Sequence, residues 1–139
     1  MKKIFPCLKV VIALVSYSCF SMPINSISPG IYTYTQKGDE LIDGQKASIT
    51  WNVNLKDNHN AIVTISSWHA PFSCDGSYSM INEKDYLSLS WSQEENVGGE
   101  CESPAPQIFM KKTSSGEVLI RSVLFPWGDG DWHSIRKIH

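Results

Sequence analysis

The segment Ala47–Leu55 alternates strictly between apolar and polar side chains, and this pattern constrains the fold more than any other part of the chain. Its apolar members are Ala47, Ile49, Trp51, Val53 and Leu55. Successive side chains of a β-strand point to opposite faces of a sheet, so this run predicts a strand with one buried and one solvated face. The polar cluster Lys56–Asn60 predicts a turn, and Ala61–Trp68 predicts the second strand of a hairpin.

Shorter runs of β-forming residues continue along the rest of the chain. The expected strands are 31–35, 47–55, 61–68, 74–80, 86–91, 107–112, 118–124 and 134–138. Residues 36–45 and 93–106 are expected to be loops, because they are polar or rich in glycine and proline. About eight antiparallel strands predict a single all-β domain. We favour an up-and-down barrel over a sandwich, because closure removes exposed strand edges.

The amino terminus has the pattern of a secretory signal peptide. Met1–Lys3 is basic, the residues from Ile4 to Phe20 are mostly apolar, and a small residue, Ser21, follows. The expected division is a signal peptide at 1–21, a tether at 22–29 and the β-barrel domain at 30–139. The apolar run is shorter than the about 20 residues of a membrane span. We therefore expect a periplasmic or secreted protein, with lipidation of Cys19 or an uncleaved anchor as alternatives.

Removal of the signal peptide leaves two cysteines, Cys74 and Cys101. In an oxidising compartment, two cysteines of a small domain are expected to pair. Such a bridge would contribute about 3–4 kcal/mol in the chain-entropy model. Because Cys101 lies in a loop and Cys74 begins an expected strand, the bridge would fix that loop at one rim of the barrel. The alternative is a thiol nucleophile or a metal ligand.

The charge of the mature chain excludes one class of partner. The whole chain has 12 Lys and Arg and 14 Asp and Glu, and three of the lysines lie in the signal peptide. The mature chain therefore has 9 basic and 14 acidic residues, a net charge of −5. A nucleic-acid-binding domain is expected to be basic, so we expect no nucleic-acid partner. Between Asp85 and Met110 the sequence has five acidic residues and no Lys or Arg.

Two segments are candidates for partner binding. The first is the acidic stretch with Glu94, Glu95, Glu100 and Glu102, and the second has Trp127, Asp129, Asp131 and Trp132. A tethered acidic loop steers a basic partner towards it, and exposed tryptophans serve as interface anchors or stack on sugar rings. The alternatives are a solvated loop in the first case and aromatic side chains that plug the barrel end in the second.

The sequence gives no support for a metal site or for catalysis. The Asp129–Asp131 stretch lacks the later ligands of a calcium loop, and the four histidines have no zinc-ligand spacing. The chain has neither a Gly-x-Ser-x-Gly elbow nor a His-Glu-x-x-His motif. We therefore expect no cofactor, no metal and no enzymatic activity.

Several short motifs between Gly30 and Leu124 carry a resemblance to a known group. They are Gly30–Tyr34, the alternating strand around Trp51, Ser73–Gly76, Leu87–Leu89 and the second cysteine in an acidic loop. This chain is similar to small exported bacterial proteins with lipocalin-like barrels, many without an assigned function. It resembles more loosely the periplasmic lysozyme inhibitors, which insert a loop into the cleft of a basic hydrolase. Their signature motif is not found here, so no inhibitory residue is carried over.

The sequence therefore predicts a non-enzymatic binding protein, an inhibitor or immunity protein against a basic cell-wall hydrolase. The first alternative is a carrier of a small apolar ligand, with Trp51, Leu89 and Trp91 lining a cavity inside the barrel. A cavity of several hundred Å³ is the usual size for such a ligand. The second alternative is a structural envelope protein without a discrete site.

Overall fold

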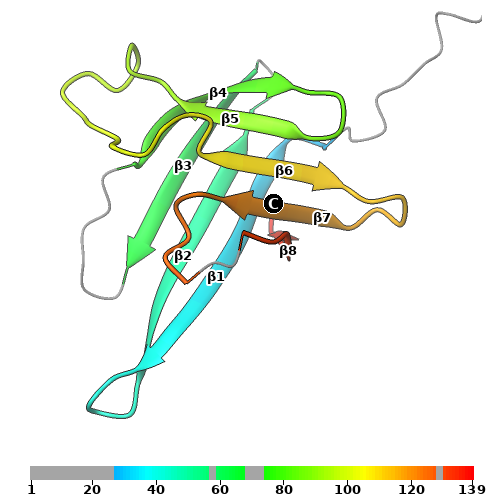
Figure 1. Cartoon of the computed structure of the whole chain (residues 1–139). Helices are drawn as coiled ribbons and strands as arrows, with labels where there is room; N and C mark the ends of the chain where they lie inside the picture. The colour runs from blue at the N-terminus through cyan, green and yellow to red at the C-terminus, as the bar shows by residue number, and fades with distance from the viewer. Residues whose placement is uncertain (1–26, 57–58, 68–73, 128–129) are drawn as a thin grey trace, which may run out of the picture.

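The structure is a computed structural model that describes residues 27–56, 59–67, 74–127 and 130–139. The expected signal peptide at 1–21, Cys19, residues 22–26 of the expected tether, and Asp129 lie outside these residues. The described residues form nine β-strands and no helix (Figure 1). The strands are β1 (Gly30–Glu40), β2 (Lys46–Leu55), β3 (Asn60–Ser67), β4 (Gly76–Asn82), β5 (Leu87–Trp91), β6 (Ile108–Lys112), β7 (Val118–Ser122), β8 (His133–Ser134) and β9 (Arg136–Lys137).

The strands form one antiparallel sheet that is almost closed into a barrel. Strands β1 to β7 pair in sequence order as an up-and-down meander. The carboxy-terminal segment then lies between the two edges of the meander, because β8 pairs with β7 and β9 pairs with β1. The prediction of a single all-β antiparallel barrel is therefore confirmed.

The alternating pattern of β2 is realised in its packing. Trp51 and Val53 are fully buried, and the Asn side chains between and after them, Asn52 and Asn54, are only partly buried. Strands β1 and β3 flank β2 and contribute inward side chains at the paired positions Tyr32, opposite Val53, and Val63, also opposite Val53. Burying an apolar side chain of this size contributes about 1.5–3 kcal/mol, so the β1–β3 sheet supplies much of the core.

The expected eighth strand is divided into two. We expected one strand at residues 134–138, and the structure has β8 and β9 on either side of Ile135. Ile135 is buried in the core, and its N–H donates to the carbonyl of Val118 at 3.0 Å. β8 pairs with β7 and β9 pairs with β1, the two edge strands of the meander. The division therefore allows one short segment to bridge both edges.

The first hairpin is longer than the sequence predicted. Residues 36–45 were expected to be a loop, but β1 continues to Glu40 and the turn is confined to residues 41–45. The pairing of β1 with β2 shifts register between Lys37 and Glu40, which marks a β-bulge. A bulge and a lysine on an edge strand both oppose pairing with another chain.

Candidate functional site

Both predicted binding segments lie at the same end of the barrel. Because the strands are antiparallel, the β1–β2, β3–β4, β5–β6 and β7–β8 connections share one end, and Figure 1 shows this end at the left. We call residues 92–107, between β5 and β6, the acidic loop. We call residues 123–132, between β7 and β8, the aromatic loop, of which 128 and 129 are not described.

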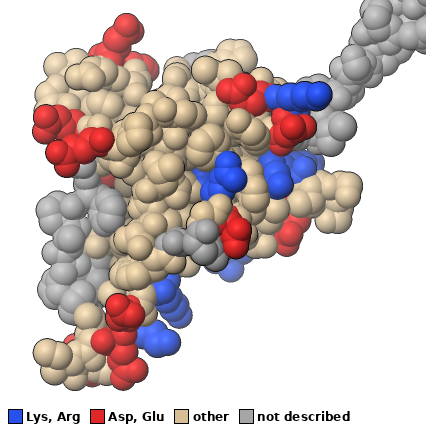
Figure 2. All heavy atoms as spheres, in the orientation of Figure 1, with Lys and Arg blue, Asp and Glu red and all other residues tan. Residues whose placement is uncertain are grey.

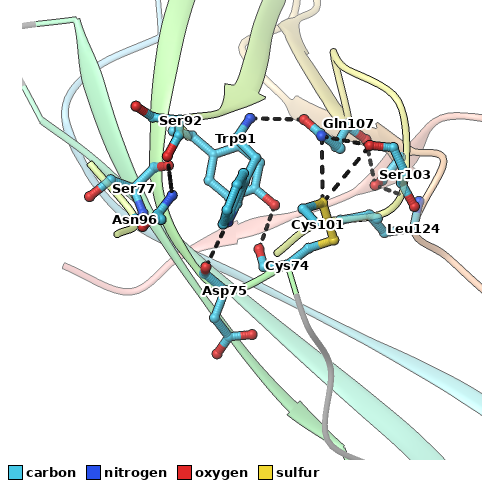
Figure 3. Close-up of a disulfide and its surroundings, with 12 residues drawn as sticks. Cys74, Asp75, Ser77, Trp91, Ser92, Asn96, Cys101, Ser103, Gln107 and Leu124 are labelled. Atoms are coloured by element: carbon cyan, nitrogen blue, oxygen red, sulfur yellow. Dashed lines mark hydrogen bonds between the residues drawn. A yellow bond between two sulfur atoms is a disulfide. The ribbon is translucent and has the colours of Figure 1, made fainter. Parts of the chain in front are cut away.

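A disulfide bond joins Cys74 and Cys101 and fixes the acidic loop to the start of β4 (Figure 3). The two Cα atoms are 4.7 Å apart, and the cysteines are 27 residues apart in sequence. Cys74 is buried in the core, and Cys101 packs against it. The predicted pairing is confirmed, and so is its place between a strand start and the acidic loop.

Asn96 attaches the first part of the acidic loop to β4. Its side-chain Nδ2 donates to the carbonyl of Ser77 at 2.8 Å and to that of Ser92 at 2.7 Å, and its Oδ1 accepts from the Ser77 N–H at 2.9 Å. The Asn96 amide thus pairs with Ser77 as a neighbouring strand would. A Cβ atom at Gly76 would clash with this amide, so the close approach requires glycine there.

Gln107 holds the other end of the acidic loop. Its side chain is only 3% exposed. Its Nε2 donates to the Ser103 carbonyl at 3.0 Å and to Cys101 Sγ at 3.5 Å, and its Oε1 accepts from the Trp91 N–H at 2.9 Å (Figure 3). The Ser122 hydroxyl donates to the Gln107 carbonyl at 2.7 Å. A buried side chain with three partners of this kind specifies a single loop conformation.

Hydrogen bonds from Tyr78 and Trp91 hold the backbone of Cys74 and Asp75, next to the disulfide. The Tyr78 hydroxyl donates to the Cys74 carbonyl at 2.6 Å, and Trp91 Nε1 donates to the Asp75 carbonyl at 2.9 Å. Burial, followed by the negative charge of Asp75, raises the pKa of Tyr78 well above its usual value. The tyrosine is therefore a neutral hydrogen-bond donor that positions the start of β4.

The four glutamates of the acidic loop point into solvent. Glu94, Glu95, Glu100 and Glu102 are all exposed, and none of them forms a salt bridge with another described residue. Figure 2 shows acidic side chains over this loop at the upper left of the molecule. The loop is firmly attached, and its carboxylates form no salt bridge with a described residue, although Lys56 lines the same hollow as Glu95.

An apolar side chain stands at the apex of the acidic loop. Val97 is 90% exposed and follows Asn96 directly. Gly98 has φ of +81°, and the Gly99 N–H donates to the Asn96 carbonyl at 3.0 Å, so a tight turn presents Val97. We did not single out Asn96, Val97 or Gln107 from the sequence. The only sequence signal for this turn was Asn96, two residues before Gly98-Gly99, because asparagine and glycine both favour turns.

The start of the aromatic loop packs into the open end of the barrel. Phe125 is buried, and the centre of its ring lies 5.0 Å from that of Trp51 and 5.1 Å from that of Tyr34. Aromatic rings at these separations stabilise each other beyond the area that they bury. Phe125 therefore plugs the barrel end, which was one of the two alternatives for this segment.

Trp127 lies against β1 and is not a free anchor. Its backbone N–H donates to Gln36 Oε1 at 3.4 Å. Its ring covers Gly38, where an added Cβ would clash with the ring. It remains 39% exposed. Trp127 thus covers the extended part of the first hairpin, on a different side of the rim from the acidic loop.

The remaining predicted residues of the aromatic loop do not join the glutamates. Trp132 is half-buried and contacts Lys111 and Arg121 on the outer face of β6 and β7. Asp131 is exposed, and Asp129 lies outside the described residues. The described members of this predicted set are therefore not one site: the four glutamates share the acidic loop, and the two tryptophans pack elsewhere.

The residues proposed for the carrier alternative line neither of two cavities in the described structure. Trp51 and Leu89 are fully buried in the core, and Trp91 is half-buried at the rim. One cavity, of about 110 Å³, lies at the opposite end of the barrel and includes Leu55 and Leu87 in its lining. Another, of about 240 Å³, lies beside the acidic loop and is lined by Ile62, Ser77 and Glu95, among others.

Two further features concern the described part of the chain. Within it, no three or more His, Cys, Asp or Glu side chains gather as they would around a metal ion. No helix there is long and apolar enough to cross a membrane. Comparison of the chain with protein-family models, with curated proteins and with solved structures finds no match in any of the three.

Proposed function

We propose that this chain is an exported, non-enzymatic binding protein whose acidic loop engages a basic protein. The observation that carries the proposal is the combination of rigidity and unneutralised charge in that loop. The disulfide, Asn96 and Gln107 fix its backbone, while four exposed glutamates flank the exposed Val97 in the sequence. A loop that is already ordered loses little entropy on binding.

The glutamates of the acidic loop and the exposed Val97 would have different roles in binding the partner. The glutamates would accelerate encounter with a basic surface, by about 10-fold or more at low salt. Val97 would enter an apolar part of the partner, because apolar contacts at the centre of an interface supply most of its stability. A cleft with a basic rim fits such a loop. The partner class that we propose is therefore a basic cell-wall hydrolase, with this chain acting as its inhibitor or immunity protein in the periplasm.

The experiment measures inhibition and binding of basic lysozymes by the mature protein. The test variant is Glu94→Gln with Glu100→Gln, and the control is Asp39→Asn with Glu40→Gln, which removes the same charge from the first hairpin. We expect inhibition by the unmodified protein, with about 10-fold weaker binding of the test variant and little change in the control. Absence of both binding and inhibition, or equal weakening of the two variants, would contradict the proposal.

A further inference from the structure

A second group of charged and aromatic side chains lies on the outside of β6 and β7. Met110 and Ile120 are fully buried, so alternation places their neighbours Lys111 and Arg121 on the outer face. Phe109 and Arg121 are directly paired positions of the two strands. Trp132 lies next to Arg121 because His133 pairs with Ile120.

The contacts within this group are short and continuous. The Arg121 guanidinium carbon lies 4.8 Å from the centre of the Trp132 ring and 5.0 Å from that of Phe109. Lys111 Nζ lies 4.5 Å from the centre of the Trp132 ring. Tyr86 packs edge-on against Phe109 at 5.5 Å. We call these five residues the cationic–aromatic face.

Both cations of this face contact aromatic rings. Within the described chain, neither the Lys111 ammonium nor the Arg121 guanidinium donates a hydrogen bond or forms a salt bridge. A guanidinium that stacks on rings keeps its N–H groups free at its edge, where they suit the oxygens of a carboxylate, sulfate or phosphate. The rings also restrict the arginine, so that binding an anion orders little more.

The face is longer than a single-ion site. It extends from Tyr86, next to β5, across β6 and β7 to Trp132, next to β8. With about 4.8 Å between neighbouring strands, it spans about 14 Å. All three aromatic residues are half-buried and leave part of their surface to solvent. The face therefore offers apolar ring surface next to two cations, over a length that exceeds one sugar ring.

We propose that the cationic–aromatic face binds an anionic saccharide chain. Arg121 and Lys111 would donate to its acidic groups, and the exposed parts of Tyr86, Phe109 and Trp132 would pack against its ring C–H groups. Figure 2 shows basic side chains over the β6–β7 part of the surface, with single acidic side chains close to them in this view and a further acidic group at the upper left, over the acidic loop. The proposal concerns a surface separate from the acidic loop and holds whether or not that loop binds a hydrolase.

The test is a titration of the mature protein followed by amide NMR signals. The probes are a tetramer of galacturonate, a heparin-derived tetrasaccharide, neutral maltotetraose and, as an anion that is not a saccharide, a hexaglutamate peptide. We expect one or both charged probes to shift the signals of Phe109, Arg121 and Trp132 at millimolar concentrations, and maltotetraose to leave them unchanged. The charged probe that binds more tightly identifies carboxylate or sulfate as the preferred group.

Variants separate recognition from general charge and from folding. Arg121→Gln and Lys111→Gln should each weaken binding by about 10-fold, and Arg121→Lys should retain part of the affinity. Lys112→Gln is the matched control, because it removes the same charge from an exposed position at the end of β6 that contacts none of these rings. Circular dichroism verifies that each variant is folded.

Three results would overturn this proposal. The first is that neither charged probe shifts signals of the face. The second is that Lys112→Gln weakens binding as much as Arg121→Gln does, which would indicate an unspecific charge effect. The third is that maltotetraose or a hexaglutamate peptide binds as tightly as the charged saccharides. The hydrolase experiment has its own readout, so the failure of one proposal does not decide the other.

Discussion

Asn96 shows how a single amide can replace a missing strand neighbour. It makes three hydrogen bonds with the backbone of Ser77 and Ser92. We predict that Asn96→Ala lowers the free energy of unfolding by about 2 kcal/mol, because it leaves the partly buried Ser77 N–H without a partner, whereas the Ser77 carbonyl still accepts from the Ser92 N–H. Gln93→Ala, an exposed position in the same loop, should change it by less than about 0.5 kcal/mol. Urea denaturation measures both, and equal values would show that the amide does not hold the loop.

Gly38 and Trp127 form a contact that can be tested as a pair. A methyl group at Gly38 would clash with the Trp127 ring. We predict that Gly38→Ala destabilises the protein by about 1–3 kcal/mol, the usual cost of overpacking, and that the ring becomes more exposed by tryptophan fluorescence. When Trp127→Ala is present, the same substitution should cost much less. If the costs are equal in both backgrounds, Trp127 does not lie on Gly38.

Tyr78 makes the stability of the fold sensitive to high pH. Burial raises the pKa of Tyr78, so its hydroxyl ionises more readily in the unfolded chain. Its stabilising contribution is complete below pH ~10, the ordinary tyrosine value, and falls by up to about 1.4 kcal/mol per pH unit above it. We therefore predict that unfolding free energies of the unmodified protein fall more steeply above pH ~10 than those of Tyr78→Phe. Parallel curves from urea denaturation would contradict this role.

The divided carboxy-terminal strand is the element that closes the barrel. Ile135 inserts into the core between β8 and β9, with 7% of its surface exposed, whereas Ile138 just beyond β9 is 43% exposed. We predict that Ile135→Ala lowers the free energy of unfolding by about 2–4 kcal/mol. Ile138→Ala, the same chemical change, should cost less than about 1 kcal/mol. Equal effects would mean that the segment does not close the barrel through its core residue.

The accuracy of the sequence-based predictions differed between elements for physical reasons. Strand β2 was predicted almost to its ends, because its alternation reflects burial on one face only. The extension of β1 to Glu40 was missed, since Gln36–Glu40 is polar and is held by pairing with β2 and by the cover of Trp127. The division of the last strand was also missed. The division arises because β8 pairs with β7 whereas β9 pairs with β1. A run of five residues does not show which strands it will pair with.

The site was predicted in part. The disulfide and the position of the acidic loop followed from the order of strands and cysteines. The separation of the tryptophans from the glutamates did not follow from that order. The acidic loop and the aromatic loop begin at the same barrel end, but their positions depend on the residues that each of them packs against. Phe125 meets Trp51 inside the barrel, whereas Trp132 meets Arg121 outside it. Such choices depend on cross-strand neighbours that are distant in sequence.

At the scale of the whole molecule, unneutralised charges of opposite sign lie on different surfaces. The acidic loop has four exposed glutamates, and the cationic–aromatic face has Arg121 and Lys111 on the outside of the barrel. Buried side chains such as Trp51 and Leu89 occupy the barrel interior between them. We therefore interpret the barrel as a rigid scaffold for external contacts, which is the premise of the proposed function.

The measurement that tests the central proposal most directly is the association rate with a basic lysozyme at several salt concentrations. The unmodified protein is compared with a variant in which Glu94, Glu95, Glu100 and Glu102 are all glutamine. We predict that the rate of the unmodified protein falls by about 10-fold or more as salt screens the loop, while that of the variant is low and nearly independent of salt. Equal rates and equal salt dependence for the two proteins would contradict a role for the acidic loop in recognition.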